Sequence, residues 1–478
     1  MSWVTYYLIF DWALRLLMIM VVLRRQWLPS VKFSWLALVL FLPELGAVLY
    51  LLLAVNYLGW RRKREHKYVL GLTGAKVRAE HLQEKMPASN VEVRVEQRAM
   101  MLQAQSTSGN PIVGGSDIRF ISSTKRYVEL VCEDIDRATD HVHLLYYIFC
   151  DDDYGRQIIN ALIHARGRGV TCRLLVDAAG SRHFIKSPAF SELKRAGIEA
   201  EAVLPVSVLR HKFSRIDMRN HRKIAVMDGC VAYAGSHNVV VENYGSEKNQ
   251  NWIDLSGRYE GPVVGQLQQV FLDDWLYQTQ MELKEDGLFP KLADAGEMPA
   301  QVVPTGPNYE AETFRRVFIA ALNSAQEKIV ITTPYFVPDE PTALALSMAA
   351  DRNVEVIVIV PAVNNHPLVK LAGEFYYDYL LASGIKIYQF SGGLLHSKTV
   401  TVDDAFGLLG SANIDIRSFH LNFEVNTLLY GAAVTRRLWE EQRMYLSYSA
   451  ELDLATWRQR STWRKYGESL ASLFSPLL

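Results

Sequence analysis

The sequence predicts an α/β protein with two similar lobes, whose mixed, largely parallel sheets are flanked by helices and related by a pseudo-twofold axis. Three observations indicate this fold. Short β-branched runs alternate with amphipathic helices, this order of elements occurs twice along the chain, and each copy ends in the same histidine-lysine motif. An N-terminal transmembrane hairpin of two hydrophobic helices is predicted to precede the lobes.

The repeated order can be followed from residue 127 onwards. In each half a helix leads to a strand and a second helix leads to a second strand, which is typical of a parallel sheet covered by helices. The segments 193–198 and 380–385 match each other as well. The predicted helices are 127–137, 156–166, 312–325 and 341–350, and the predicted strands are 141–149, 170–176, 328–333 and 354–360.

The N-terminal region contains two long apolar runs. Residues 3–23 and 33–58 each reach the ~20 residues that a bilayer-spanning helix needs, and the first lacks the basic start and cleavage site of a signal peptide. Asp11 and Arg15 can face each other one helical turn apart. We expect Arg15 also to neutralise Glu44 of the second run, because a charge at membrane depth is costly. The alternative is that either segment lies flat or re-enters.

A basic segment, residues 61–64, follows the second run and favours a cytoplasmic location for the lobes. Basic residues in the loop between the runs oppose this orientation. The expected domains are a hairpin over 1–60, a basic juxtamembrane linker over 61–110 with a helix near 75–85, a first lobe over 111–295, a second lobe over 296–452, and a basic and apolar tail over 453–478.

Composition limits the classes of function. The chain has 478 residues with 51 basic and 51 acidic side chains, so it carries no overall charge that would attract a polyanion. Its four cysteines show no zinc-site spacing, and we expect buried, reduced thiols. The four are Cys132, Cys150, Cys172 and Cys230.

The strongest signal is a doubled motif. His221 and Lys223 are followed five residues later by Asp228, and His396, Lys398 and Asp403 repeat this spacing. Seven residues after each aspartate comes a small-residue turn of the form Gly-Ser-x-Asn, which contains Ser236 and Asn238 in the first copy and Ser411 and Asn413 in the second. One such motif is weak evidence, but two with the same turn are not a coincidence.

The residue types of the motif suit a phosphoryl group. Side chains two apart on a strand share a face, so each histidine should lie beside its lysine. Two imidazoles, two ammonium groups and the asparagine amides around one anion form a phosphodiester site without a metal. One histidine would act as a neutral nucleophile and the other would protonate the leaving oxygen.

Carboxylates are expected to orient the histidines. Asp254 and Glu424 occupy comparable strand positions beyond each motif, and we predict that Asp254 holds His221 and that Glu424 holds His396. The motif aspartates are expected to brace their loops rather than carry protons.

Structural explanations compete with functional ones for several residues. A lone histidine is more often a hydrogen-bonded core residue, and only the doubling favours catalysis. Asp177 and Asp415 fit either role. Four aromatic residues at strand ends could wall the pocket or belong to the core: Tyr146, Tyr147, Tyr335 and Phe336.

With these motifs the chain resembles the phospholipase D superfamily and, within it, the bacterial cardiolipin synthases of the phospholipase D type. The resemblance includes the hydrophobic hairpin and nearly the whole chain. Beyond the motifs, it is carried by the segments 332–340, 366–369, 417–426 and 473–478.

The resemblance implies a membrane-bound phosphatidyltransferase in the bacterial inner membrane. One phosphatidylglycerol would form a phosphatidyl-histidine with His221 and release glycerol, with His396 as general acid. A second phosphatidylglycerol would then displace the histidine to give cardiolipin. No metal or other cofactor is implied, the partners are phosphatidylglycerol and anionic membrane lipid rather than nucleic acid, and a homo-oligomer stays open.

Two segments agree with a lipid substrate. Residues 205–213 and the tail, with its basic and aromatic residues 457–465 before the apolar 470–478, have the character of segments at an anionic interface. Both could equally be packing segments. The alternative function is a hydrolase with the same intermediate, a phospholipase D or a membrane-tethered nuclease, because water competes with the lipid alcohol. A nuclease should show a basic, aromatic-lined groove, which the sequence does not reveal.

Overall fold

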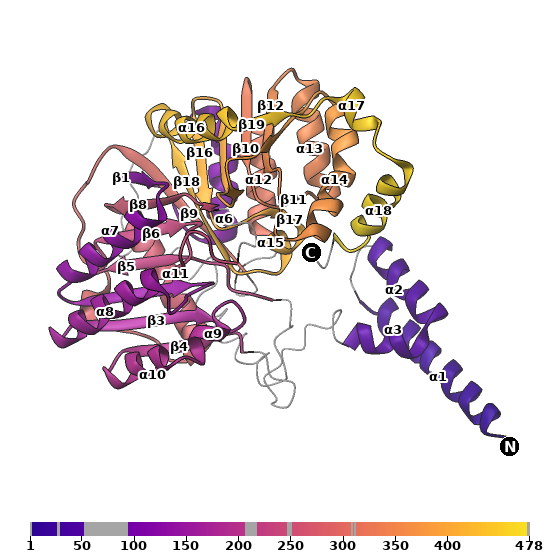
Figure 1. Cartoon of the computed structure of the whole chain (residues 1–478), viewed down its shortest axis with the longest axis horizontal. Helices are drawn as coiled ribbons and strands as arrows, with labels where there is room; N and C mark the ends of the chain where they lie inside the picture. The colour runs from indigo at the N-terminus through magenta and orange to yellow at the C-terminus, as the bar shows by residue number, and fades with distance from the viewer. Residues whose placement is uncertain are drawn as a thin grey trace. The chain divides into compact units, whose positions relative to one another are not determined.

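The structure, a computed structural model, describes residues 2–25, 29–51, 94–205, 218–245, 251–306, 309 and 312–475. The chain divides into an N-terminal helical unit and a large α/β unit (Figure 1). Residues 52–93, including the expected helix near 75–85, and most of the segment 205–213 lie outside the described residues.

Three helices make up the described N-terminal unit: α1 (Trp3–Leu23), α2 (Pro29–Phe41) and α3 (Pro43–Leu49). Among the described residues, α1 is long and apolar enough to cross a membrane. The second apolar run is broken where α3 begins with Pro43, because proline cannot continue the preceding helix. The three helices pack on one another around Met18, Val22, Val39, Ala47 and Tyr50.

The predicted pairing of Arg15 with Glu44 is wrong. The Nε atom of Arg15 donates to Asp11 Oδ2 at 2.9 Å, and its guanidinium also donates to the carbonyl of Leu40. Glu44 instead accepts a hydrogen bond from the hydroxyl of Tyr7 at 2.7 Å. The arginine already has a carboxylate one helical turn away, and a tyrosine satisfies the glutamate.

Among the described residues of the large unit, one sheet of fifteen strands runs through both lobes. At its centre β1 (Val113–Ile121) pairs antiparallel with β9 (Met298–Thr305). Outward from β1 lie β8 (Ser256–Glu260), β6 (Val231–Gly235), β5 (Ile224–Met227), β2 (His141–Tyr146), β3 (Thr171–Asp177) and β4 (Glu199–Val203). Outward from β9 lie β18 (Glu424–Tyr430), β16 (Phe406–Gly410), β15 (Thr399–Val402), β10 (Lys328–Thr332), β12 (Glu355–Pro361), β13 (Lys386–Phe390) and β19 (Ser449–Glu451).

This strand order has the symmetry that a pseudo-twofold axis requires. In each lobe the strands near the centre are antiparallel and three strands further out are parallel, with β2, β3 and β4 matching β10, β12 and β13. Strand β19 pairs antiparallel with β13 at the edge of the second lobe. The predicted helices of the repeat are confirmed as α7 (Thr124–Arg137), α8 (Asp153–Gly167), α12 (Thr313–Ser324) and α13 (Glu340–Asp351).

The remaining elements connect these layers. They are α9 (Arg182–Ile185), α10 (Pro188–Arg195), β7 (Trp252–Ile253), α11 (Val263–Thr279), the 3₁₀ turn Asp286–Leu288, β11 (Phe336–Val337), α14 (Pro367–Ala382), β14 (Leu394–Leu395), β17 (Ile414–Asp415), α15 (Ile416–His420), α16 (Ala432–Ser447), α17 (Leu454–Arg458) and α18 (Thr462–Ser472).

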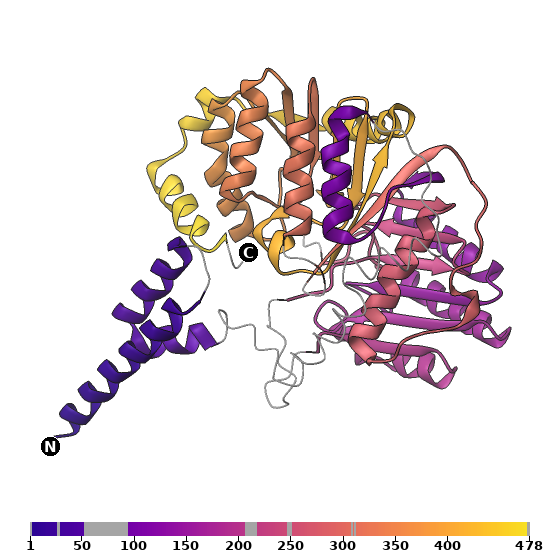
Figure 2. The ribbon, with the colours of Figure 1, turned by 180° about the vertical axis from the view of Figure 1, so that it is seen from behind.

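Part of the expected linker is structured. Residues 95–108 form α6 (Val95–Ser108), which packs along α12 (Figure 2). Met100 and Ala104 of α6 are fully buried. The helix ends at Gly109, whose φ of 78° lies in the left-handed region that glycine adopts without strain. Its weak amphipathic pattern explains why the sequence did not reveal it.

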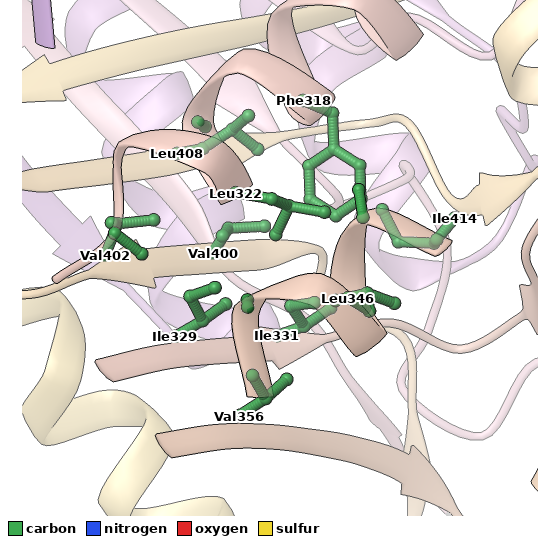
Figure 3. Packing of buried hydrophobic residues seen from close by; sticks show 14 of the residues in the cluster. Phe318, Leu322, Ile329, Ile331, Leu346, Val356, Val400, Val402, Leu408 and Ile414 are labelled. Carbon is green, nitrogen blue, oxygen red and sulfur yellow. The ribbon is translucent and has the colours of Figure 1, made fainter. Parts of the chain in front are cut away.

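Three main hydrophobic cores hold the sheet and its helices together. One belongs to the first lobe. A second belongs to the second lobe, where Phe318 and Leu322 of α12 pack on Ile329, Ile331 and the neighbouring strands (Figure 3). The third contains residues of both lobes, including Leu145, Trp275, Val302, Leu409 and Val425. Since this core is shared, the lobes are built as one unit.

All four cysteines are free thiols. Cys172 is buried and Cys132 and Cys150 are half-buried, but Cys230 is exposed in the turn after the first motif, contrary to the expectation of four buried thiols.

Candidate active site

The two histidine-lysine motifs open onto one cavity of about 420 Å³ at the seam between the lobes. His221 and Lys223 precede β5, and His396 and Lys398 precede β15, in extended segments rather than within the strands themselves. The cavity is lined by Tyr147, Ile148, His221, Lys223, Asn238, Tyr244, Gly245, Trp252, Tyr335, Asn365, His366, Val369, His396, Lys398, Ser411, Asn413, Asp415, Arg417 and Asn422.

Each histidine is placed by a backbone segment of the other lobe. In the second motif, β14 pairs in parallel with β7, and the backbone N–H of His396 donates to the carbonyl of Ile253 at 2.8 Å. In the first motif, Asn220 forms a parallel bridge with Phe423, and the N–H of His221 donates to the Phe423 carbonyl at 2.9 Å. The residue after each acceptor carbonyl is a carboxylate, which therefore lies beside the histidine of the opposite lobe.

The orienting carboxylates are therefore crossed, and the predicted assignment within each lobe is wrong. His221 Nδ1 lies 3.0 Å from Glu424 Oε1, and His396 Nδ1 lies 2.6 Å from Asp254 Oδ1. Sequence reasoning found both carboxylates but paired each with its nearest motif, because a parallel strand pairing between lobes leaves no trace in local spacing. With Nδ1 engaged, each ring keeps Nε2 for chemistry.

The serines of the Gly-Ser-x-Asn turns support the two carboxylates unequally. Ser411 Oγ donates to Glu424 Oε2 at 2.6 Å, so Glu424 is held by Ser411 as well as by His221. Ser236 Oγ bonds the backbone of Leu255, accepting from its N–H at 2.9 Å and donating to its carbonyl at 3.2 Å. Both serines are buried and fix the strand that carries the carboxylate.

Two buried lysines face the cavity. Lys223 Nζ donates to the carbonyl of His221 at 2.6 Å, and Lys398 Nζ donates to the carbonyl of His396. Burial lowers the pKa of Lys223 to about 8 despite the nearby carboxylates. Burial, followed by the positive charge of Lys223, lowers the pKa of Lys398 to about 7. An anion bound between them would restore both charges.

Burial and then the charge of Lys398 lower the pKa of His396 to about 4, although Asp254 opposes this shift. Burial raises the pKa of Asp254, but His396, His237 and Lys398 outweigh it and hold that pKa below its usual range. Burial also lowers the pKa of His237 to about 4. At neutral pH His396 is thus neutral and lies next to an ionised Asp254.

Amide side chains complete the anion site. Asn238 lines the cavity, and its Oδ1 accepts from the N–H of Ile148 at 3.1 Å, so its NH₂ group is the end that can donate to a ligand. Asn413 and Asn422 also line the cavity, and their side-chain oxygens have no hydrogen-bond partner among the described residues. Asn422 Nδ2 lies 3.3 Å from His221 Nδ1.

The motif aspartates brace loops, as the sequence indicated, and do not line the cavity. Asp228 accepts from the backbone N–H groups of Thr139, Asp140 and His141 at 2.8–2.9 Å. Asp403 accepts from the matching groups 326–328 at 2.8–3.0 Å. Both have positive φ, 52° and 50°, and each begins the tight turn after its motif strand. Each ties that turn to the start of the antiparallel neighbour, β2 for Asp228 and β10 for Asp403.

The sequence allowed either a structural or a functional role for several residues, and the structure shows that some of them line the cavity and others do not. Tyr147 and Tyr335 line it, whereas Tyr146 and Phe336 are core. Asp177 accepts from Ala179, Gly180 and Asn220 backbone N–H groups and is structural. Asp415 lines the cavity and also caps α15, accepting from the Ser418 N–H at 2.7 Å.

Sequence reasoning missed several cavity residues. Trp252 packs edge-on against His396 at 4.5 Å between ring centroids, as Tyr147 does against His221 at 4.4 Å. Trp252 and Asn422 each stand two residues before an orienting carboxylate, and this shared register is the signal that could have found them. Others, such as Tyr244, Asn365 and Arg417, come from loops without a repeated pattern.

Arg222, between His221 and Lys223, is fully buried and points away from the cavity. Its guanidinium pairs with Asp274 of α11 and donates to the carbonyls of Thr305 at 2.7 Å and Glu424 at 3.0 Å. It also lies 5.3 Å from the ring of Phe423. It therefore ties the first motif to the strands of the second lobe.

The fold and the doubled site define a class: two lobes that each contribute one histidine and one lysine to a shared cavity are the arrangement of the phospholipase D superfamily. The family described as "Cardiolipin synthase, PLD-like domain" matches residues 131–275 and 318–444. The chain belongs to this cardiolipin synthase family and is an enzyme of it.

Individual relatives agree with this membership. Cardiolipin synthase A of Yersinia pseudotuberculosis serotype IB is 34% identical over 469 residues, which cover 96% of this chain and 95% of the relative. Cardiolipin synthase A of Yersinia pestis gives the same values. Among solved structures, phosphatidylserine synthase of Haemophilus influenzae Rd KW20 covers 81% of this chain and 100% of its own, with a TM-score of 0.59 at 12% identity, which shows a shared fold.

Proposed function

We propose that the chain transfers a phosphatidyl group from one phosphatidylglycerol to the head-group hydroxyl of another, forming cardiolipin and glycerol. One observation carries the proposal: two imidazoles, each held through Nδ1 by a carboxylate of the other lobe, open with two lysines onto one cavity. The near full-length similarity to the cardiolipin synthase A of two Yersinia species supports the choice of substrate.

In the first step, His221 Nε2 attacks the phosphorus of the donor lipid. The N–P bond forms while the bond from phosphorus to the glycerol oxygen breaks, and protonated His396 donates its proton to that oxygen. Glycerol leaves and a phosphatidyl-histidine remains. The choice of His221 as nucleophile follows the resemblance to the superfamily.

In the second step, His396 is neutral and accepts the proton of the second lipid's hydroxyl. The hydroxyl oxygen attacks phosphorus, the N–P bond breaks, and His221 is restored. One phosphodiester replaces another, so the reaction needs no nucleotide. Lys223, Lys398 and the asparagine amides stabilise charge on the phosphoryl oxygens.

Substrate binding would favour the protonation of His396 from solvent. In the empty site, burial and Lys398 hold the pKa of His396 near 4, so its ring is neutral. A phosphodiester anion beside the lysines raises the pKa of this imidazole, because an opposite charge favours the protonated form. The acid would thus become competent only once the lipid head group occupies the cavity.

We further propose that both N-terminal apolar runs cross the bacterial inner membrane and that the lobes lie on the cytoplasmic side. The length and apolar character of α1 support the first crossing, and the basic segment 61–64 supports the orientation. The second run would cross with its helix broken at Pro43.

The test is an assay of the purified full-length protein with phosphatidylglycerol as sole substrate. We expect cardiolipin and glycerol in equal amounts, whereas phosphatidic acid without cardiolipin would show a hydrolase. His221→Ala and His396→Ala should each lose at least about 10²-fold in turnover. His183→Ala is the matched control, because this histidine is exposed and outside the cavity lining.

Trapping the intermediate assigns the two histidines. Acid-labile phosphohistidine should accumulate in His396→Ala and be absent from His221→Ala. The reverse result would exchange the two roles.

A further inference from the structure

The outward side of α18 is apolar, which is unusual for a helix on a protein surface. Five residues at helical spacing form what we call the α18 outer face, and their exposed fractions range from 44% to 85%. They are Trp463, Tyr466, Leu470, Leu473 and Phe474, the last two just beyond the helix end.

The opposite side of α18 fixes the helix on α14. Glu468 and Ala471 are buried there, and Ala471 packs in a small cluster with Ala372 and Val337. Arg464 donates to the buried Glu374 at 2.7 Å. The outer face is therefore presented by a docked helix and not by a frayed tail.

The contacts also give the direction of α18. Trp457, ahead of the helix, contacts Tyr377, Arg464 pairs with Glu374, and Ala471 reaches the cluster of Ala372. Residue numbers rise along α18 as those of its partners fall along α14, so the two helices are antiparallel. They lie side by side in Figure 1.

This direction brings the apolar end of α18 to the cavity. The first turn of α14 carries Val369, which lines the cavity together with His366 and also packs on the Ala471 cluster. Leu368, in the same turn, is 44% exposed. Leu470, Leu473 and Phe474 thus lie at the end of α18 that is next to the cavity rim.

We propose that the α18 outer face rests on the bilayer surface and receives the acyl chains of a lipid whose head group occupies the cavity. The inference rests on the proposed lipid substrate. A cavity of about 420 Å³, whose lining includes the lysines and amides of the anion site, has the volume for a phosphoglycerol head group but not for two acyl chains. The chains must therefore extend beyond the rim, where only an apolar surrounding avoids the cost of exposing them to water.

The composition of the segment fits a bilayer surface. Tryptophan and tyrosine are enriched at the membrane–water interface, and here they lead the outer face while leucine and phenylalanine follow. The arginines of the segment are paired within the protein, Arg458 and Arg464 with Asp378 and Glu374 of α14 and Arg460 with Glu468. The outer face is therefore expected to bind the interface mainly through its apolar and aromatic side chains.

The first test compares two forms of the substrate. Full-length enzyme in phosphatidylcholine vesicles receives either long-chain phosphatidylglycerol within the bilayer or dihexanoyl phosphatidylglycerol dissolved in water. The variant carries Leu470→Ser, Leu473→Ser and Phe474→Ser. The control carries Met444→Ser and Tyr448→Ser, at and just after the end of α16, where both side chains are 58% exposed.

We expect the α18 variant to lose at least about tenfold in turnover of the bilayer substrate, from the lost apolar contact, and to match wild type on the dissolved substrate. Equal loss on both substrates would mean a structural role, and no loss on either would mean an unused surface; each overturns the inference. If wild type turns over neither form, the proposed function fails instead.

A second test probes the membrane contact of the α18 outer face without measuring enzyme activity. A fluorophore is placed at Leu473→Cys, with Met444→Cys as control, after the three cysteines that reach solvent are replaced by alanine. In vesicles of phosphatidylcholine and phosphatidylglycerol, doxyl-labelled lipid should quench position 473 and aqueous iodide should not. Quenching by iodide alone, or protection from both quenchers by a second copy or the N-terminal helices, would overturn the inference.

Discussion

Two lysines buried at one anion site make ligand binding depend on pH. In the empty site the pKa of Lys398 is about 7 and that of Lys223 about 8, because burial penalises the charged forms. A bound phosphodiester favours the charged forms and raises both pKa values. Binding therefore takes up protons above pH 7, so the affinity should be highest at lower pH and fall as pH rises through the pKa values of the empty site.

We expect the affinity for glycerophosphoglycerol, the deacylated head group, to fall by up to about tenfold per pH unit for each lysine that must be charged. Calorimetric titration between about pH 6 and about pH 9 measures this, a range that brackets both shifted pKa values. Lys398→Met should bind more weakly and lose the lower step of the pH dependence, whereas Lys125→Met on the exposed side of α7 should behave as wild type. An affinity independent of pH would contradict the role of the lysines.

At the residue scale, the sequence predicted which residues belong to the site better than which of them pair with each other. The doubled spacing identified both histidine-lysine pairs, and strand position identified Asp254 and Glu424 as carboxylates of the site. Their exchange between the lobes could not be predicted, because it depends on β14 joining β7 and on Asn220 bridging Phe423 across the seam. Such pairings are set by tertiary packing and leave no local pattern.

At the element scale, Arg222 makes the first motif rigid. The segment before β5 has few ladder hydrogen bonds of its own, and the guanidinium connects it to α11, β9 and β18 through Asp274 and two carbonyls. Ser397 holds the matching place in the second motif and offers no such group. The two half-sites are therefore anchored differently, although their histidines have the same geometry.

Arg222→Met should cost about 3–5 kcal/mol of stability, because it leaves the carboxylate of Asp274 buried without its cation. Arg222→Lys should recover only part of this loss, since an ammonium group cannot reproduce the planar fork. Denaturant unfolding measures the stability. At denaturant concentrations below the unfolding transition, kcat should also be lower than in wild type, because Glu424 and His221 lose their alignment. Ser397→Ala is the matched control and should change stability by less than about 1.5 kcal/mol; an equal effect in both variants would contradict the argument.

The elements that the sequence revealed have either a strong period or a place in the internal repeat. Helices α7, α8 and α12 and the outer parallel strands show clear amphipathic or β-branched patterns, whereas α13 is weakly amphipathic and was revealed by the repeat. Helix α11 is buried on nearly every side, including Gln266, Gln268, Asp273 and Asp274, and so lacks the polar stripe that marks a surface helix. Strands β1 and β9 were missed as well, although they form the centre of the sheet.

At the scale of the whole molecule, the pseudo-twofold axis follows from the repeat, but the continuous sheet does not. The repeat predicts two lobes in any arrangement that brings the motifs together. The pairing of β1 with β9 and the core shared by Leu145, Val302 and Val425 make one rigid seam, and the cavity lies on it. Both histidines of a site therefore belong to the same chain.

Mixing inactive variants tests this conclusion. Full-length His221→Ala and His396→Ala, unfolded together and refolded or co-expressed, should recover no turnover, because every cavity lacks one of its two histidines whatever the oligomeric state. Wild type mixed with His221→Ala should retain activity in proportion to the wild-type fraction. Recovery in the mixed variants would mean that lobes of two chains form the site, and that the seam between β1 and β9 can open to exchange partners.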